Sequence, residues 1–155
     1  MKILFICLGN ICRSPMAEAI FNHKARQLDQ ENWASFSAGT GNYHIGDRPD
    51  SRTLHVLSQK GIESTSRAQN ISSYNPHDFD FWVAMDTSNL EDTRQAYPEI
   101  GDRLVLMTDF DPISPGKPVP DPYWGDIPDF EEVFTILDRS MDRFIQHLQE
   151  ASPGI

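Results

Sequence analysis

The sequence is poor in cysteine, in basic residues and in long apolar runs. Two cysteines among 155 residues are too few for a disulfide-stabilised scaffold, so we expect a reducing, cytoplasmic environment. Lys and Arg number 13 against 23 Asp and Glu, and the net charge of −10 disfavours nucleic acid or an anionic membrane as a partner. No apolar stretch approaches the roughly 20 residues that span a bilayer. The N-terminal segment lacks the basic region and the small-residue cleavage site of a signal peptide.

The composition that remains is that of a folded globular protein. Hydrophobic residues make up 39% of the chain and aromatic residues 10%, which is enough for an ordinary core. The chain contains no internal repeat and no low-complexity linker. Its length suits one domain, which we expect to occupy residues 1–155.

Short apolar segments alternate with segments of helical periodicity. We expect strands at 2–8, 33–37, 79–85 and 103–107. We expect helices at 14–28, from the N-cap Asp50 to Gly61, from the capping-box pair Ser88 and Glu91 to Pro98, and across 130–148. This order predicts an α/β fold, a four-stranded parallel sheet with helices on both faces. Ligands of such sheets bind beyond the carboxyl ends of the strands, which points to the loop after the first strand.

That loop has the residue types of an anion-binding site. It reads Cys7-Leu8-Gly9-Asn10-Ile11-Cys12-Arg13-Ser14. A loop between a buried strand and a helix N-terminus turns backbone N–H groups inward, and the helix dipole adds to their positive field. Gly9 and Asn10 accept the left-handed backbone of a tight turn, and Arg13 offers a planar fork for two phosphate oxygens. We expect phosphate to bind here.

Cys7 lies at the base of this loop. A helix N-terminus and a nearby cation favour the thiolate, which is a strong nucleophile. We expect Ser14 to donate a hydrogen bond to this thiolate and to stabilise it as a leaving group. A lone cysteine at the end of a strand is more often a small core residue. Five residues separate Cys7 from Arg13 between a strand and a helix, and this spacing favours the nucleophile.

The segment CLGNICRSPMAE resembles the phosphate-binding loop of the low molecular weight protein tyrosine phosphatases. These small α/β enzymes carry the Cys–five residues–Arg signature near the N-terminus, whereas the larger tyrosine and dual-specificity phosphatases carry it deep in the chain. The similarity runs from residue 2 to about residue 148. It implies an enzyme that hydrolyses phosphotyrosine in proteins and that also hydrolyses small aryl phosphates.

The resemblance also implies a general acid. The family draws it from an aspartate in an Asp-Pro-Tyr segment, and this chain has Asp121-Pro122-Tyr123 at the end of a proline-rich stretch, 112–122. A lone Asp-Pro pair is often only a turn, but together with the N-terminal loop it indicates the acid. The proline-rich stretch is expected to be an ordered loop that holds Asp121 over the phosphate site.

The implied mechanism has two steps. Cys7 attacks phosphorus while Asp121 protonates the leaving oxygen, and water then hydrolyses the phosphocysteine with Asp121 as base. Arg13 and the loop amides hold the phosphate oxygens in both steps. No metal or other cofactor is implied, and no cluster in the sequence has metal-ligand spacing. The five histidines are scattered and are expected to be surface or packing residues.

Further positions are assigned by the resemblance. It implies that Ser37 hydrogen-bonds Asn10 and so supports the loop, although a serine at a strand end explains Ser37 equally well. Tyr43, Tyr123 and Trp124 fall where the family has the aromatic walls of its substrate cleft, which suit a phosphotyrosine ring. Exposed aromatic residues in loops also serve as packing residues.

One departure from the family pattern involves a supporting histidine. Many relatives have histidine at the position of Ser66. No reacting group changes, so we expect an altered rigidity of the loop with its chemistry retained. Cys12 could protect Cys7 from over-oxidation by forming a reversible disulfide, or could simply fill space as a buried thiol.

Three alternatives remain beside the tyrosine phosphatase. An arsenate reductase of this fold needs further cysteines to relay a disulfide, and the chain has none after Cys12. A non-catalytic phosphate-binding module would be indicated by loss of Cys7 or Asp121, and both are present. A phosphoarginine phosphatase tends to have threonine at the position of Ile11, so isoleucine favours phosphotyrosine. The sequence leaves the physiological substrate open, and also whether the chain is a monomer or a weak dimer.

Overall fold

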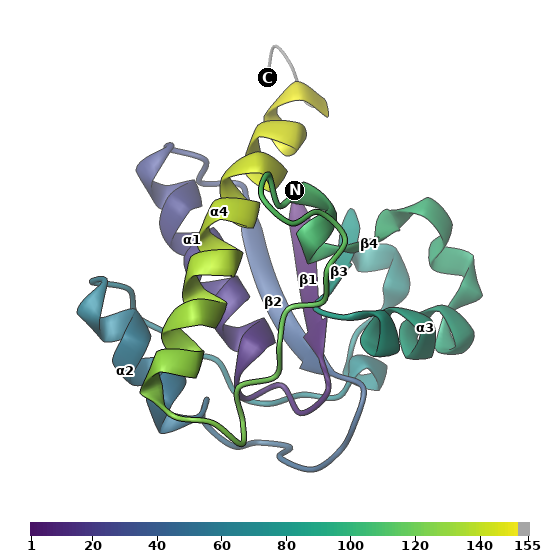
Figure 1. Cartoon of the computed structure of the whole chain (residues 1–155). Helices are drawn as coiled ribbons and strands as arrows, with labels where there is room; N and C mark the ends of the chain where they lie inside the picture. Colours follow the sequence, from purple (N-terminus) through teal and green to yellow (C-terminus); the bar gives the residue numbers. More distant parts are fainter. Residues whose placement is uncertain (152–155) are drawn as a thin grey trace.

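A computed structural model describes residues 1–151. A single β-sheet forms the centre of the fold. Its strands are β1 (Lys2–Cys7), β2 (Ala34–Gly39), β3 (Phe81–Ala84) and β4 (Leu104–Leu106). All of them are parallel, in the order β2-β1-β3-β4, as Figure 1 shows. The predicted four-stranded parallel sheet is therefore confirmed.

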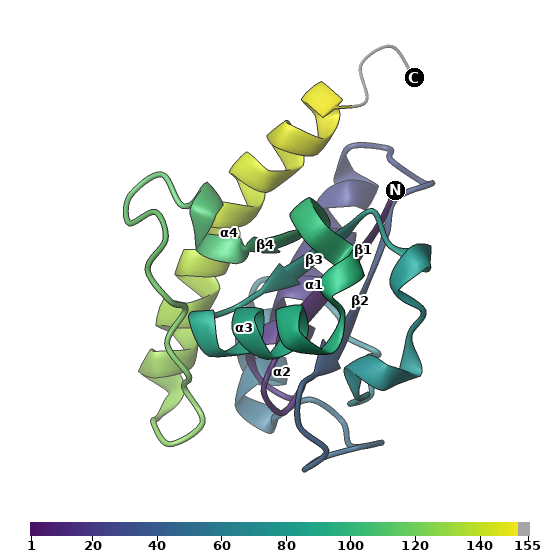
Figure 2. The same cartoon turned by 90° about the vertical axis from the view of Figure 1, so that its right-hand side faces the viewer.

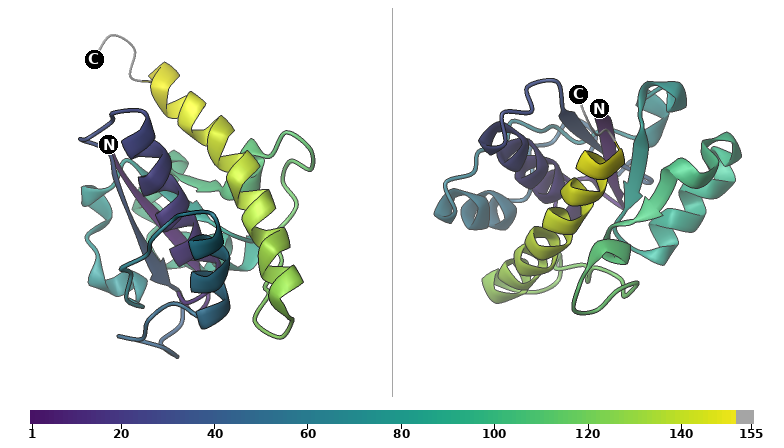
Figure 3. Two further views of the ribbon diagram at one scale, coloured as in Figure 1. Left: turned by 90° about the vertical axis from the view of Figure 1, so that its left-hand side faces the viewer. Right: turned by 90° about the horizontal axis from the view of Figure 1, so that it is seen from above.

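Helices cover both faces of this sheet. They are α1 (Arg13–Gln27), α2 (Ser51–Gln59), α3 (Thr87–Ala96) and α4 (Ile127–Ala151). The long helix α4 lies beside α1 on one face, and α2 packs against both of them. Helix α3 lies on the opposite face (Figure 2), and the view from above in Figure 3 places the strands between α3 and the α1–α4 pair. Short 3-10 helices occupy connections, at Ile71–Ser73, Pro76–Asp78, Pro98–Arg103 and Met107–Phe110.

Alternate side chains of β1 build two separate cores. Phe5 and Cys7 join the core beneath α1 and α4, whereas Leu4 and Ile6 join the core on the α3 face. This follows from the two-residue repeat of a strand that is buried on both faces. The repeat places the Cys7 side chain on the α1 face of the sheet, where the following loop returns to begin α1.

The ends of the elements differ from the predictions in a few places. Strand β2 runs on to Gly39 instead of ending at 37, because Gly39 stays in register with Cys7 of β1. The N-cap of α2 is confirmed, since the Asp50 carboxylate accepts the Arg52 N–H at 2.8 Å. The predicted stop at Gly61 is also confirmed, with φ of +72°.

The predicted capping box of α3 is wrong. The helix begins at Thr87, and its N-cap is Asp86, whose carboxylate accepts the N–H of Asn89 at 2.8 Å. Asp86 has an extended backbone, as an N-cap residue requires, so Ser88 already lies inside the first turn. Spacing alone did not separate the two possible caps.

The proline-rich segment is an ordered connection from β4 to α4. Near its start, Asp111 forms a two-pronged ion pair with Arg139 of α4, at 2.8 and 2.9 Å. Further on, the buried Val119 donates its N–H to the carbonyl of Met85 at 3.0 Å. These anchors lead the segment past the carboxyl end of the sheet, where the loop after β1 also lies (Figure 1).

No helix within the described part of the chain, residues 1–151, has the length and apolar character that crossing a membrane would need. The predicted single domain extends to residue 155, and its last four positions, 152–155, lie outside the described residues.

Candidate active site

The loop after β1 wraps around the Cys7 thiol. Asn10 has a left-handed backbone, with φ of +58°, and this turns its N–H back to Cys7 Sγ at 3.3 Å. The Asn10 side chain fixes the same turn, because its amide donates to Ser14 Oγ at 2.8 Å and its oxygen accepts the Gln69 N–H at 2.8 Å. The expected tight turn is therefore present, with Asn10 as its left-handed residue.

Gly9 does not adopt the left-handed backbone that we predicted for it, since among the described residues its φ is not positive. Its lack of a side chain serves a different purpose. A Cβ at this position would lie 3.2 Å from Cδ2 of His44, so a larger residue would push against that ring. Gly9 thus permits the close approach of another loop.

Arg13 is held rigidly for an arginine. It is 3% exposed, and its Nη1 donates to Asp86 Oδ2 at 2.7 Å and to the Val119 carbonyl at 2.9 Å. Burial alone would lower the pKa of Arg13, but the charges of Cys7, Asp86 and Asp121 raise it above its ordinary value. The guanidinium therefore stays charged at the base of the site.

Asp121 faces this base from the proline-rich loop. Its Oδ1 accepts the Tyr123 N–H at 3.1 Å, and its Oδ2 lies 3.9 Å from Nη2 of Arg13. The side chain is 46% exposed, so the carboxylate is within reach of a ligand and of water. Asp121, Cys7 and Arg13 line one cavity of about 370 Å³.

The mouth of this cavity is aromatic. Tyr43 and Trp124 are 73% and 93% exposed, and Trp124 stacks on Tyr123 with the ring centroids 4.9 Å apart. The cavity lining includes most of the residues assigned from the sequence, namely Cys7, Leu8, Gly9, Ile11, Cys12, Arg13, Tyr43, Asp121, Tyr123 and Trp124. Asn10 and Ser14 lie behind this lining and contact Cys7 from within.

The predicted hydrogen bond between Ser37 and Asn10 is not formed. Strand alternation directs Ser37 toward α1, where its Oγ donates to Glu18 Oε1 at 2.6 Å. Ser66 joins the same carboxylate, with its Oγ 3.3 Å from Glu18 and 3.2 Å from Ser37 Oγ. Burial raises the pKa of Glu18, although the two hydroxyl hydrogen bonds partly offset this rise.

Cys12 is a second thiol in the same loop as Cys7. It is buried and free, as is Cys7. Burial, followed by the charge of Asp50, raises the pKa of the Cys12 thiol well above its ordinary value. Cys12 is therefore a neutral thiol, unlike the nucleophile that we predict at Cys7.

Within residues 1–151, no three or more His, Cys, Asp or Glu side chains are grouped so that they could hold a metal ion. The metal-free mechanism expected from the sequence remains a prediction.

Three contributors to the site were missed by sequence reasoning. His44 lines the cavity beside Tyr123, at a ring distance of 6.2 Å, although we had expected the histidines to be surface or packing residues. Asp86 holds Arg13, and Arg52 binds the loop that carries Asp121. A usable signal existed for Asp86, because it follows a buried strand whose carboxyl end meets the same edge of the sheet.

Comparison with known proteins identifies relatives over the whole chain. The family model of low molecular weight phosphotyrosine protein phosphatases matches residues 2–153. A low molecular weight phosphotyrosine protein phosphatase of Schizosaccharomyces pombe is 40% identical over 154 residues, which is 96% of this chain and 97% of that protein. A protein tyrosine phosphatase of Entamoeba histolytica has a crystal structure that covers 99% of both chains, with a TM-score of 0.93 and 35% identity.

A Drosophila arginine phosphatase also has this fold, with a TM-score of 0.89 and 30% identity over 96% of this chain and 98% of its own. The chain therefore belongs to the low molecular weight phosphotyrosine protein phosphatase family.

Proposed function

We propose that this chain hydrolyses phosphotyrosine through a phosphocysteine intermediate on Cys7. One observation carries the proposal. The Cys7 thiol and the Arg13 guanidinium of one loop and the Asp121 carboxylate, more than 100 positions farther along the sequence, line a single cavity with an aromatic mouth. These are a nucleophile, an oxyanion ligand and a proton donor, the groups that phosphoryl transfer without a metal requires.

In the first step the Cys7 thiolate attacks phosphorus, and the bond from phosphorus to the phenolic oxygen breaks. Asp121, in its protonated form, gives its proton to that oxygen, so a neutral phenol leaves. Arg13 and the N–H groups of the loop, apart from that of Asn10, which faces Cys7 Sγ, bind the non-bridging oxygens. Arg13 is supported in this role by its fixed hydrogen bonds to Asp86 and Val119.

In the second step water attacks the phosphocysteine and the sulfur–phosphorus bond breaks. Asp121, now ionised, takes a proton from the water and so returns to its starting form. The Cys7 thiolate is the leaving group. The hydroxyl of Ser14, 2.9 Å from Sγ, and the Asn10 N–H, 3.3 Å from it, stabilise the returning negative charge.

The walls of the cavity support an aromatic substrate. Tyr43 and Trp124 expose rings at the mouth that would lie along a phenyl group whose phosphate reaches Cys7. Phosphotyrosine-bearing proteins are thus the proposed substrates. The reducing environment implied by the two free thiols supports a cytoplasmic enzyme, which we take to be a monomer or weak dimer.

A second candidate is phosphoarginine hydrolysis. The likeness to a Drosophila arginine phosphatase supports it. Ile11, which lines the cavity where that branch tends to have threonine, favours phosphotyrosine. The two substrates can be compared directly as phosphotyrosine and phosphoarginine peptides of the same sequence. Faster hydrolysis of the phosphoarginine peptide would reverse the assignment.

The test of the proposed function is hydrolysis of p-nitrophenyl phosphate by freshly reduced protein in EDTA. We expect activity in the wild type, none in Cys7→Ser and a reduction of at least about 100-fold in Asp121→Ala. Arg94→Gln is the control, because Arg94 is exposed on α3 and pairs with Glu91. A wild type that binds phosphate without turnover would indicate the non-catalytic binding module instead.

A further inference from the structure

The first turn of α2 lies between the two loops that carry the proposed catalytic groups. Toward the nucleophile loop, the Asp50 N–H donates to the carbonyl of Ile11 at 2.8 Å. The Thr53 hydroxyl donates to the carbonyl of Cys12 at 3.3 Å. Toward the loop of Asp121, the same turn extends one long side chain, that of Arg52.

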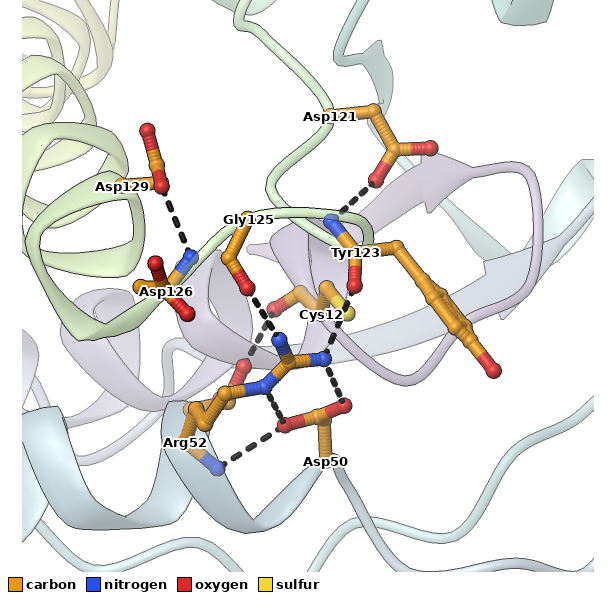
Figure 4. A network of polar contacts seen from close by, with 9 residues as sticks. Cys12, Asp50, Arg52, Asp121, Tyr123, Gly125, Asp126 and Asp129 are labelled. Atoms are coloured by element: carbon orange, nitrogen blue, oxygen red, sulfur yellow. Dashed lines mark hydrogen bonds and ion pairs between the residues drawn. The ribbon is translucent and has the colours of Figure 1, made fainter.

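Arg52 joins this turn to the loop that follows Asp121 (Figure 4). Its Nη1 donates to the carbonyl of Gly125 at 2.7 Å, and its Nη2 donates to the carbonyl of Tyr123 at 3.0 Å. On its other side, Nε and Nη2 donate to the Asp50 carboxylate at 3.0 and 2.9 Å. The guanidinium also lies over the Phe130 ring, 4.4 Å from its centroid. Such a set of directed contacts leaves it little freedom.

Tyr123 connects the Arg52 clamp, which is the set of hydrogen bonds from Arg52 to Asp50, Tyr123 and Gly125, to the carboxylate of Asp121. The carbonyl of Tyr123 accepts from Arg52, while the N–H of the same residue donates to Asp121 Oδ1 at 3.1 Å. The orientation of one backbone residue therefore sets the direction of the Asp121 side chain. Few other groups constrain that side chain, since it is exposed and its nearest cation, Arg13, is 3.9 Å away.

We propose that Arg52 is a positioning residue for proton transfer, which holds Asp121 over the phenolic oxygen by fixing the backbone of residues 123–125 relative to the Cys7 loop. The inference rests on the proposed function, in which Asp121 is the general acid. Arg52 itself does not line the cavity and does not reach the reacting atoms. Its effect should therefore appear only where catalysis depends on the acid.

The dependence of rate on the leaving group isolates that effect. A general acid matters most when the departing phenol is weakly acidic, and matters little when the phenolate leaves readily by itself. We would measure kcat/KM, which reports the phosphorylation step, for phenyl phosphate, p-nitrophenyl phosphate and 2,4-dinitrophenyl phosphate. Arg52→Gln is expected to lower the value about 10-fold for phenyl phosphate and less than about 2-fold for the dinitrophenyl ester.

Reference variants separate this inference from the proposed function. Asp121→Asn should show the same pattern with a larger loss for phenyl phosphate, and Arg94→Gln should leave all three values unchanged. If Asp121→Asn lowers kcat/KM by the same factor for every ester, Asp121 is not the general acid, and the proposed function is overturned as well. If Asp121→Asn behaves as expected but Arg52→Gln loses equally on every ester, or loses nothing, only the positioning role of Arg52 is overturned.

Two further measurements guard against a purely structural effect. Inhibition by inorganic phosphate should change less than about 2-fold in Arg52→Gln, because the Cys7 loop keeps its own ligands. Arg52→Lys keeps the charge without the two-pronged geometry, so full recovery of the phenyl phosphate rate would overturn the clamp. Arg52→Met also removes the guanidinium but places an apolar side chain beside the Phe130 ring, and it carries the same comparison if Arg52→Gln does not fold.

Discussion

The Oγ of Ser14 lies 2.9 Å from the Sγ of Cys7, and Asn10 determines how that hydroxyl can be used. The Asn10 amide donates to Ser14 Oγ at 2.8 Å, which leaves the hydroxyl proton free to point elsewhere. Its two possible acceptors are Cys7 Sγ and the Ala38 carbonyl, which lies farther off at 3.5 Å. The geometry thus favours donation to sulfur, and more so when the sulfur is negatively charged.

Ser14→Ala is expected to slow turnover. A hydrogen bond to a charged group contributes about 1.5–3 kcal/mol, so its loss should lower kcat by about 10- to 100-fold. The thiolate is the leaving group of the second step, so phosphocysteine should accumulate. Rapid-quench assays with p-nitrophenyl phosphate would reveal this as a burst followed by slow turnover. A kcat equal to that of the wild type would show that Ser14 only fills space.

Removal of Asp86 should affect both the site and the fold. Asp86→Ala removes one of the two hydrogen bonds of Arg13 Nη1 and leaves the bond to the Val119 carbonyl, and it also removes the N-cap of α3. We expect kcat/KM to fall about 10-fold and the free energy of unfolding to fall by about 1 kcal/mol. Asp86→Asn keeps a capping oxygen and should therefore lose activity with little loss of stability. Equal losses of stability in both variants, measured by urea unfolding, would contradict this division of roles.

Much of the fold could be predicted from local patterns in the sequence. The apolar runs identify the strands, because a parallel strand buried on both faces has few polar residues. The Cys7–Arg13 segment between a strand and a helix indicates the tight turn around Cys7, and phosphate binding there stays a prediction. Asp50 and Gly61 mark the ends of α2 because capping depends on a few neighbouring atoms.

The predictions that failed concern contacts between segments that are distant in the sequence. Ser37 meets Glu18 and not Asn10, because the strand's twofold repeat and the path of α1 decide its neighbour. The role of Asp86 at the site was missed for the same reason, because its hydrogen bond to Arg13 spans 73 positions of sequence. Such contacts follow from packing, and a local pattern does not encode them.

Alkylation should distinguish the two thiols. Burial and the charge of Asp50 raise the pKa of Cys12, so it stays protonated and unreactive near neutral pH. Iodoacetate, an anion, should therefore modify Cys7, with inactivation in proportion to labelling and with protection by inorganic phosphate. Peptide mass spectrometry locates the label. Uptake by Cys12 in the Cys7→Ser variant would contradict the expectation.

Arg139→Met should destabilise the protein in a pH-dependent way. The Arg139 guanidinium holds the pKa of the buried Asp111 below its ordinary value of 3.8. The pair therefore contributes stability above pH 3.8, and this contribution is lost as pH falls through the lower pKa of the folded state. Because the buried carboxylate loses its partner, Arg139→Met should lower the free energy of unfolding by about 3 kcal/mol at pH 7 and by less at pH 3. Urea unfolding at both values tests this, and an equal cost at both would refute it.

Glu18→Gln should stabilise the protein as pH rises. Burial raises the pKa of Glu18 in the folded state above its ordinary value of 4.5, so folding favours the protonated carboxyl. The stability that this proton confers is complete below pH 4.5 and is lost as pH rises through the higher folded pKa. A neutral glutamine, which can still accept from Ser37 and Ser66, avoids that loss. Its advantage over the wild type should therefore grow between pH 4.5 and pH 7.5, toward about 1 kcal/mol. Glu63→Gln removes an equal charge from an exposed position, so its free energy of unfolding should differ from that of the wild type by the same amount at every pH. A difference in Glu18→Gln that is likewise independent of pH would disprove the prediction.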